Sequence, residues 1–179
     1  VPARIGITIG DAAGIGPEIT LKALQDQSIK EDCLPIAIGD ALFLERLAAE
    51  LEFDFDFEVV KAGNPIPKVS NKIIVYDLEN LNKTITAGEE SGITGKASAE
   101  NIETAVNLCL NKEIGAIATA PISKKALSMA GYGFPGHTEM LAHLTQTKEF
   151  AMSFFANDLR VVLHSTHVSL LDAISLVKT

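Results

Sequence analysis

The sequence predicts an α/β protein whose core strands are largely parallel. Short apolar runs rich in β-branched residues, such as 4–10 and 34–39, alternate along the chain with segments of helical period, such as 17–27 and 40–51. This alternation is typical of βαβ units, in which successive strands run in the same direction. The composition agrees, because 47% of the 179 residues are hydrophobic and 21% are charged, which is enough apolar material for a packed core.

The first half of the chain is predicted to alternate strands with helices. Pro17 suits the first turn of a helix, and Asp40 is a residue type that commonly begins one. The prolines and the glycine of 63–71 predict a loop between two strands. In chain order, the predicted elements are strand 4–10, helix 17–27, strand 34–39, helix 40–51, strand 57–62 and strand 72–78.

A helix over 96–113 is the most regular element predicted in the second half. Apolar residues recur there at spacings of three and four, which places them on one helical face. They are Ala99, Ile102, Val106 and Cys109. The other predicted elements are strand 114–120, helices 123–131 and 138–146, strands 149–156 and 159–167, and helix 169–178.

The charge of the chain excludes some classes of partner. The formal net charge is −8, and the acidic residues are spread along the chain. The absence of a basic patch or a basic amphipathic helix argues against nucleic acid and against an anionic membrane as partners.

Cys33 and Cys109 lie far apart in apolar segments, which predicts free, buried thiols. Because no apolar run approaches the roughly 18 residues of a membrane span, we expect a cytoplasmic protein.

The stretch GFPGHTEMLAHL, residues 133–144, places a Pro-Gly turn before a His-Thr-Glu triplet that opens a helical segment. The first N–H groups of a helix lack internal partners and carry a partial positive charge, so this position suits an anion. His137 and Thr138 would add side-chain donors to such a site. Alternatively, His137 or Thr138 caps the helix and Glu139 complements its dipole. The residues alone leave both interpretations open.

The glycine-rich stretch GDAAGIGPE, residues 10–18, follows the first predicted strand and suggests nucleotide binding. A dinucleotide fingerprint that starts at Gly14 would need a glycine where Ile19 stands, and the Gly-Lys-Ser/Thr of a Walker loop is absent. Asp11 and Glu18 would also repel a phosphate at close range. The alternative interpretation is a tight turn that leads into the following helix.

Two histidines near the end of the chain, His164 and His167, form an H-x-x-H pair that can serve a metal ion but also occurs by chance. In a strand over 159–167, residues three apart point to opposite faces, so both side chains cannot reach one ion. We therefore expect His167, at the end of the strand, to face a cleft and His164 to pack in the core. His143 follows Glu139 by one helical turn and is expected at the surface or as a partner of Glu139 within the helix.

Several stretches of the sequence together carry a family resemblance. They are GDAAGIGPEI, GKASAENIETA, ATAPISKKAL, GFPGHTEML and LRVVLHSTHVSLLDA. Their order and spacing resemble the 4-hydroxythreonine-4-phosphate dehydrogenase family over essentially the whole chain, and the first loop alone also resembles isocitrate and isopropylmalate dehydrogenases. The family usually has proline where Ala12 and Ser169 stand, and often asparagine where Ser123 stands. None of these departures removes a residue to which the resemblance assigns a role.

The resemblance implies an α/β subunit with the isocitrate/isopropylmalate-dehydrogenase-like two-domain fold, assembled as a homodimer with its active site between the domains. It implies oxidation of 4-phosphohydroxy-L-threonine by NAD, with loss of carbon dioxide, to 3-amino-2-oxopropyl phosphate in pyridoxal phosphate biosynthesis. A divalent cation such as zinc, magnesium or cobalt would polarise the alcohol and stabilise the enolate-like charge. The alternatives are a dehydrogenase for another phosphorylated hydroxy acid, such as erythronate 4-phosphate, or an inactive anion-binding fragment.

The resemblance also assigns roles to individual residues. His137 and Thr138 match the family's substrate-binding pair, and His167 matches a metal ligand. Lys124 is a weaker candidate for a cation of the cleft, with solvent exposure as the alternative. Because family members are substantially longer, residues 1–179 are expected to be an amino-terminal part of the subunit that is inactive alone, with the NAD site and the other metal ligands beyond it.

Overall fold

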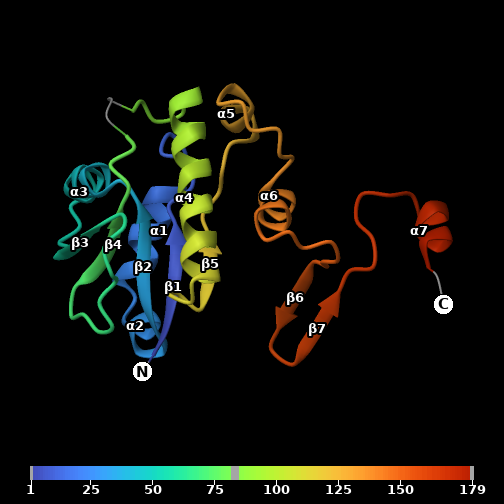
Figure 1. Ribbon diagram of the computed structural model, residues 1–179, viewed down its shortest axis with the longest axis horizontal. Coiled ribbons are helices and arrows are strands. Elements are labelled where there is room, and N and C mark those ends of the chain that lie inside the picture. Colours follow the sequence, from blue (N-terminus) through green and yellow to red (C-terminus); the bar gives the residue numbers. More distant parts are fainter. Residues whose placement is uncertain (1, 82–84, 178–179) are drawn as a thin grey trace. The chain divides into compact units, whose positions relative to one another are not determined.

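The computed structural model describes residues 2–81 and 85–177 of the chain. The chain divides into two compact units, Val1–Thr145 and Gln146–Thr179, whose elements are labelled in Figure 1. Within the described residues, no helix has the length and apolar character that crossing a membrane requires.

A five-stranded sheet forms the centre of the first unit, in the order β3-β4-β2-β1-β5, and all of its neighbouring strands are parallel (Figure 1). The strands are β1 (Ala3–Thr8), β2 (Cys33–Gly39), β3 (Phe57–Lys61), β4 (Ile73–Asp77) and β5 (Ala116–Thr119). In the register of the sheet, Ile5 of β1 lies between Pro35 of β2 and Ala116 of β5. The α/β class and the parallel strands predicted from the sequence are therefore confirmed.

Helices cover both faces of this sheet (Figure 1). They are α1 (Gly16–Gln25) and α3 (Ala41–Glu50) on one face, and α4 (Gly92–Leu110) on the other. Side chains along β2 alternate between the two layers, because Ala37 packs with residues of α1 and α3, whereas Ile36 and Ile38 pack with residues of α4. Burial on both faces explains why 34–39 is a continuous apolar run.

The order of the strands creates a crevice at the carboxyl ends of β1 and β5. From β1 the chain passes through α1 to β2 on one side, whereas α4 later carries it to β5 on the other side of β1. In open parallel sheets, ligands bind where the strand order reverses in this way, outside the carboxyl ends of the strands. The loops that follow β1 and β5 are therefore the expected place for a ligand.

Helices α5 (Lys124–Met129) and α6 (His137–Leu144) pack on α4. Ile102 of α4, Leu127 of α5 and Met140 of α6 are buried in one cluster. Helices α4 and α5 approach closely because Gly95 has no side chain, since a Cβ there would lie 1.9 Å from the carbonyl oxygen of Ala126. Helix α4 thus fixes the positions of the two helices that follow β5.

Two helix boundaries differ from the sequence prediction for local reasons. Helix α4 begins at Gly92 rather than at 96, because the Ser91 hydroxyl accepts a hydrogen bond from the Thr94 N–H at 3.2 Å and caps the helix. A short helix that was not predicted, α2 (Gln27–Asp32), follows α1 and is capped in the same way by Asp26. In both places the serine or aspartate cap stabilises a helix in a segment whose sequence shows only a weak helical pattern.

Both cysteines of the chain are free thiols, as predicted. Cys33 and Cys109 are half-buried rather than fully buried. Burial raises the pKa of the Cys33 thiol, and the nearby Asp32 carboxylate acts in the same direction. A thiol with a raised pKa is protonated at neutral pH and is therefore a poor nucleophile.

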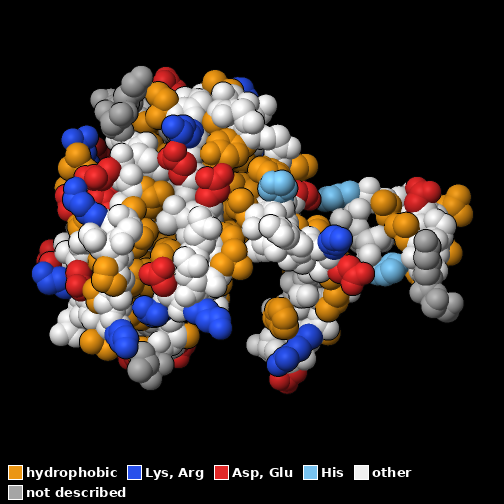
Figure 2. Space-filling model, in the orientation of Figure 1, with side chains coloured by type: hydrophobic (Ala, Val, Ile, Leu, Met, Phe, Trp, Pro, Cys, Tyr) orange, Lys and Arg blue, Asp and Glu red, His pale blue; other side chains and the backbone are white. Residues whose placement is uncertain are grey.

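The second unit contains an antiparallel hairpin and one helix. They are β6 (Ser153–Ala156), β7 (Leu159–Val162) and α7 (Leu170–Leu176). All residues of both strands are exposed, and the exposed fractions of Phe155 and Leu171 are 71% and 79%. Figure 2 shows hydrophobic side chains on the surface of this unit. Apolar surface of this extent is unusual for a monomer and marks an interaction face.

We expect the 179-residue chain to self-associate, because the second unit exposes large apolar side chains that association would remove from water. Sedimentation velocity over a range of concentrations should show species larger than the monomer. Phe155→Ser and Leu171→Ser should shift the distribution toward the monomer. Val69→Ser is the matched control, because Val69 is 73% exposed but lies in the first unit. A monomer at every concentration would contradict this prediction.

Candidate functional site

The loop after β1 is held against the loop after β5. The Asp11 N–H donates a hydrogen bond to the carbonyl oxygen of Pro121 at 3.0 Å. Gly10 lies at φ +71°, and a Cβ there would stand 2.2 Å from the same carbonyl oxygen, so the close approach requires glycine. Asp11 Oδ1 accepts a hydrogen bond from the Ala13 N–H at 2.8 Å, which closes a tight turn. The glycine-rich stretch 10–18 therefore forms a tight turn, which is one of the two interpretations drawn from the sequence.

A cavity of about 350 Å³ adjoins these two loops. It is lined by Asp11, Ala13, Gly14, Ile15, Gly88, Glu90, Pro121, Ile122 and Ser123. Asp11 is 3% exposed, and its Oδ2 is buried without a hydrogen-bond partner among residues 2–81 and 85–177. Hydrogen bonds from Ser123 and Lys125 lower the pKa of Glu90, which keeps this second carboxylate charged. The cavity therefore disfavours a phosphate and suits a group that donates hydrogen bonds.

His137 and Thr138 form the first turn of α6, as predicted. Gly136 precedes the helix, and no side chain caps it. The interpretation in which His137 or Thr138 serves as the cap is therefore wrong. Thr138 is exposed, and no side chain occupies the first N–H groups of this helix, so this turn has hydrogen-bond donors to offer a ligand.

His137 lies at the same edge of the sheet as the loop after β5. Its ring is half-buried and hydrogen-bonds to the backbone of Ala120, the residue that follows β5. Its Nε2 is shielded from solvent and has no partner among the described residues. Burial lowers the pKa of His137, and the hydrogen bond to Ala120 acts in the opposite direction. Burial thus disfavours the charged form of the ring in the absence of a ligand, and Nε2 is a nitrogen that a bound group could satisfy.

The histidines of the second unit lie outside any strand. Strand β7 ends at Val162, which pairs with Ser153 at the end of the hairpin ladder, so 163–169 is irregular. The predicted burial of His164 is wrong because this residue is exposed, and the argument from alternating strand faces does not apply to it. His167 is exposed as well, and its backbone lies at φ +57°, a conformation that residues other than glycine rarely adopt.

The remaining two candidates of the sequence analysis both lie in the first unit. His143 is exposed on α6, as predicted, with its ring centroid 5.3 Å from that of Phe134. Lys124 is exposed at the start of α5, as one of its two interpretations expected. Within the described ranges, no group of three or more His, Cys, Asp or Glu side chains is placed to hold a metal ion.

Comparison with known proteins decides the family. A family model described as "Pyridoxal phosphate biosynthetic protein PdxA" matches residues 31–179. The chain belongs to the PdxA family. The resemblance drawn from the sequence motifs is thereby confirmed.

Individual relatives of the PdxA family cover nearly all of the chain. A D-threonate 4-phosphate dehydrogenase of Cupriavidus necator is 42% identical over 170 residues, which are 95% of this chain and 51% of the relative. A 4-hydroxythreonine-4-phosphate dehydrogenase of Trichlorobacter lovleyi is 36% identical over 178 residues, which are 98% of this chain and 53% of the relative. The crystal structure of a 4-hydroxythreonine-4-phosphate dehydrogenase from Burkholderia phymatum is similar with a TM-score of 0.91 and 38% identity, over 98% of this chain and 53% of that chain. The chain thus spans about half the length of the relatives that it matches.

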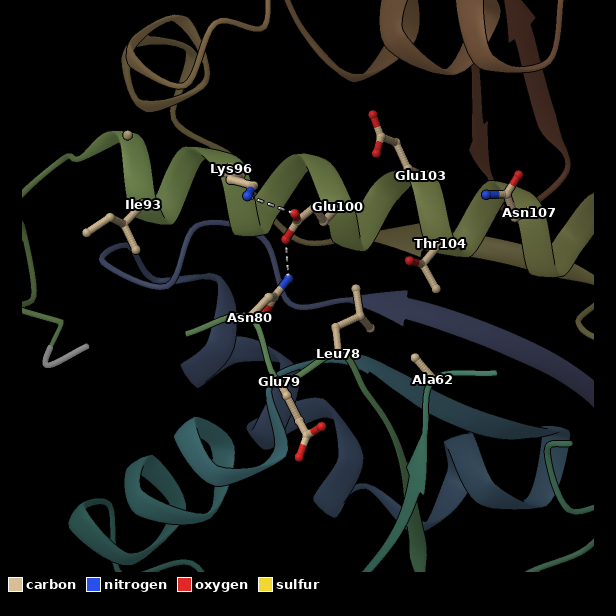
Figure 3. A pocket seen from close by; sticks show the side chains of 11 residues that line it. Ala62, Leu78, Glu79, Asn80, Ile93, Lys96, Glu100, Glu103, Thr104 and Asn107 are labelled. Atoms are coloured by element: carbon tan, nitrogen blue, oxygen red, sulfur yellow. Dashed lines mark hydrogen bonds and ion pairs between the residues drawn. The ribbon is translucent and has the colours of Figure 1, made fainter. Parts of the chain in front are cut away.

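A larger cavity, of about 780 Å³, lies on the face of the five-stranded sheet that α4 covers (Figure 3). Asn80 Nδ2 donates a hydrogen bond to Glu100 Oε2 at 3.1 Å, and Lys96 lies 3.5 Å from the same carboxylate. Burial raises the pKa of Glu103, and the charge of Glu100 adds to this effect. Among the described residues that line this cavity, Lys96 is the cation and it is engaged by Glu100, so this cavity is less suited to a phosphate although it is the larger of the two.

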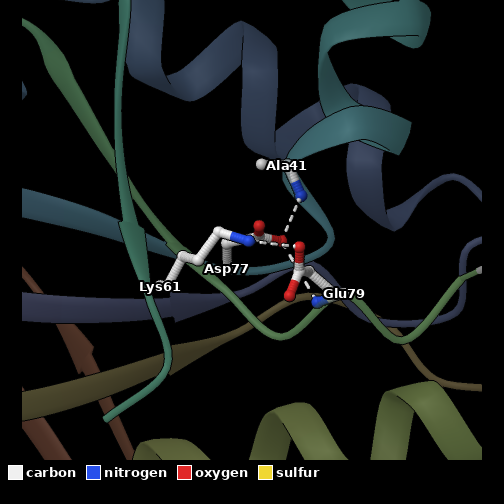
Figure 4. Close-up of polar contacts among 4 residues, drawn as sticks. All are labelled: Ala41, Lys61, Asp77 and Glu79. Carbon is white, nitrogen blue, oxygen red and sulfur yellow. Dashed lines mark hydrogen bonds and ion pairs between the residues drawn. The ribbon is translucent and has the colours of Figure 1, made fainter. Parts of the chain in front are cut away.

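Asp77, at the end of β4, supports the fold and was not singled out from the sequence (Figure 4). Its Oδ1 accepts hydrogen bonds from the N–H groups of Ala41 at 2.9 Å and Glu79 at 3.1 Å. Glu79 in turn forms an ion pair with Lys61 at 2.6 Å, which raises the pKa of Lys61. The carboxylate of Asp77 thus joins the start of α3 to the loop after β4, and we assign it no role in ligand binding.

Proposed function

We propose that the protein containing this chain is a dehydrogenase that acts on a 4-phosphorylated hydroxy acid and transfers hydride to NAD. The names of the PdxA-family relatives support this class of reaction. The start of α6 carries the proposal in this chain, because it combines an uncapped helix terminus with an unpaired nitrogen of His137. Both features suit the phosphate end of a substrate.

The residues of this chain contribute binding and orientation. The first-turn N–H groups and the Thr138 hydroxyl can donate hydrogen bonds to phosphate oxygens. Nε2 of His137 can add a donor once the ring is protonated, a form that the negative charge of a bound phosphate favours. Holding the phosphate in this way positions the alcohol that is oxidised within the site. Orientation of this kind lowers the activation free energy, because the entropy cost is met during binding.

NAD and a divalent cation, which the family resemblance implies, remain proposals for the whole protein. The described residues by themselves do not fit either group. They include no cluster of three metal-binding side chains, and the glycine-rich loop after β1 faces a cavity lined by Asp11 and Glu90. No chemical step is therefore assigned to residues of this chain through the metal or through NAD.

Two substrates are candidates beside erythronate 4-phosphate, the alternative drawn from the sequence. The resemblance drawn from the motifs implies 4-phosphohydroxy-L-threonine, whose oxidation and decarboxylation would serve pyridoxal phosphate biosynthesis. The 42% identity to a D-threonate 4-phosphate dehydrogenase favours D-threonate 4-phosphate as the second candidate. The two compounds differ in the group at C2, which is an ammonium in the first and a hydroxyl in the second. Their shared phosphate end is the part that the start of α6 would recognise.

An assay of NADH formation by the intact protein tests this proposal. The substrates are 4-phosphohydroxy-L-threonine, D-threonate 4-phosphate and erythronate 4-phosphate, each compared with its unphosphorylated form. We expect turnover of at least one phosphorylated acid, with a preference of at least about 100-fold over the unphosphorylated form, because a site built for a polar group rejects analogues that lack it. Equal turnover of the phosphorylated and unphosphorylated forms, or no turnover of any compound, would contradict the proposal.

The homodimer and the cytoplasmic location expected from the sequence stay predictions. The exposed apolar faces of the second unit support association with a second subunit.

A further inference from the structure

The side chain of Lys124 reaches from α5 to the start of α6. Its Cε lies 3.9 Å from the position that a Cβ on Gly136 would occupy, and Gly136 is the residue before the first turn of α6. Lys124 is exposed and forms no ion pair with any residue of 2–81 or 85–177. A positive charge that is in no ion pair with the described residues therefore lies beside the residues that open α6.

The neighbouring lysine is used differently. Lys125 forms an ion pair with Glu90 at 3.0 Å, and the Ser123 hydroxyl donates a hydrogen bond to the same carboxylate. Lys125 is thus held in an ion pair, whereas Lys124 forms none with the described residues. The two lysines are adjacent in sequence and both exposed, so they form a matched pair for substitution.

One carboxylate also faces the start of α6. Oε2 of Glu139 lies 3.5 Å from the same Cβ position on Gly136. Without a nearby cation, this carboxylate would repel an anion that approaches the uncapped first turn. Lys124 offsets the charge of Glu139, so the uncapped helix terminus that begins at His137 can attract an anionic group.

We propose that Lys124 is a specificity-determining residue, whose ammonium group contacts the phosphate end of the ligand at the start of α6. This inference rests on the proposed function, which places the phosphate at His137 and Thr138. An ammonium group interacts strongly with a phosphate dianion and only weakly with a neutral hydroxyl. Lys124 therefore separates phosphorylated hydroxy acids from their unphosphorylated forms.

Calorimetric titration of the intact protein with inorganic phosphate, and with the phosphorylated hydroxy acid that it oxidises, tests this role. We expect Lys124→Ala to weaken both affinities by about tenfold, which is between the effects of an exposed ion pair and of a buried charged hydrogen bond. Lys124→Arg should keep the affinity within about threefold, because it retains the charge. Lys125→Ala should leave it unchanged, and Glu139→Gln should strengthen it. In the assay, Lys124→Ala should raise KM for the phosphorylated acid with little change in kcat.

The outcomes separate this inference from the proposed function. If His137→Ala weakens phosphate binding but Lys124→Ala does not, the inference is wrong and the proposed function stands. Equal effects of Lys124→Ala and Lys125→Ala would also overturn the inference, because they would show a general effect of surface charge. If the unaltered protein neither binds phosphate nor oxidises any phosphorylated acid, both proposals fail. Circular dichroism of each variant establishes that it is folded.

Discussion

Replacing His137 with alanine in the intact protein is expected to weaken binding of the phosphorylated substrate by about one to two orders of magnitude, since a hydrogen bond to a charged group contributes roughly 1.5–3 kcal/mol. The Nε2 of His137 has no partner among the described residues, and in the protonated ring, which a bound phosphate favours, it donates a hydrogen bond to a phosphate oxygen. Alanine removes this donor but keeps the residue at the first turn of α6. Calorimetry with the phosphorylated substrate measures the change directly.

His143 offers a matched control for this experiment. It lies on the same helix, it is exposed, and its ring packs beside that of Phe134 rather than at the helix start. His143→Ala should change the substrate affinity by less than about twofold, because exposed side chains away from a site contribute little. Equal affinities of the His137→Ala variant and the unaltered protein would exclude His137 from the binding site.

Much of the fold follows from local features of the sequence. The β-branched runs predict the strands because a strand buried on both faces must be apolar throughout, as β2 is. Asp40 begins α3 as predicted, since its Oδ1 accepts a hydrogen bond from the Phe43 N–H at 2.8 Å. Caps of this kind act over three residues and can therefore be recognised without knowledge of the tertiary structure.

The end of β7 could not be predicted in the same way. The apolar residues of 159–163 continue toward His164, but β6 begins at Ser153, which pairs with Val162, so β7 has no partner residue in the ladder beyond Val162. This limit is set by the partner strand rather than by the residues near His164. The predicted burial of His164 failed for this reason, although the predicted hairpin itself is confirmed.

The candidate site was predictable in its position but not in its chemistry. The Pro-Gly turn and the triplet after it place His137 and Thr138 at the first turn of a helix, which the structure confirms. The unpaired nitrogen of His137 depends on packing beside Ala120, and the approach of Lys124 to Gly136 depends on how α5 and α6 pack on α4. Such relations join residues of different elements, so local sequence patterns do not contain them.

For His167, we expect a role as a ligand of a divalent cation in the intact protein and only weak binding by the 179-residue chain alone. An open catalytic metal site commonly takes three protein ligands, and the described residues contain no such group. His167 is exposed and lies at φ +57°, and a non-glycine residue held in this region often belongs to a functional site. A single imidazole does not replace enough of the hydration shell of a cation to bind it tightly.

Titration with Co²⁺ and Zn²⁺, followed by calorimetry and by the absorption of bound Co²⁺, tests the role of His167. In the intact protein, His167→Ala should lower the metal affinity by at least about 100-fold, because loss of an outer-shell partner already costs about 10–100-fold. His164→Ala is the matched control, since His164 is also exposed and lies three residues earlier in the same irregular segment. It should leave both the affinity and the Co²⁺ spectrum unchanged. Tight binding of one ion by the 179-residue chain that persists in His167→Ala would show that other side chains hold the metal.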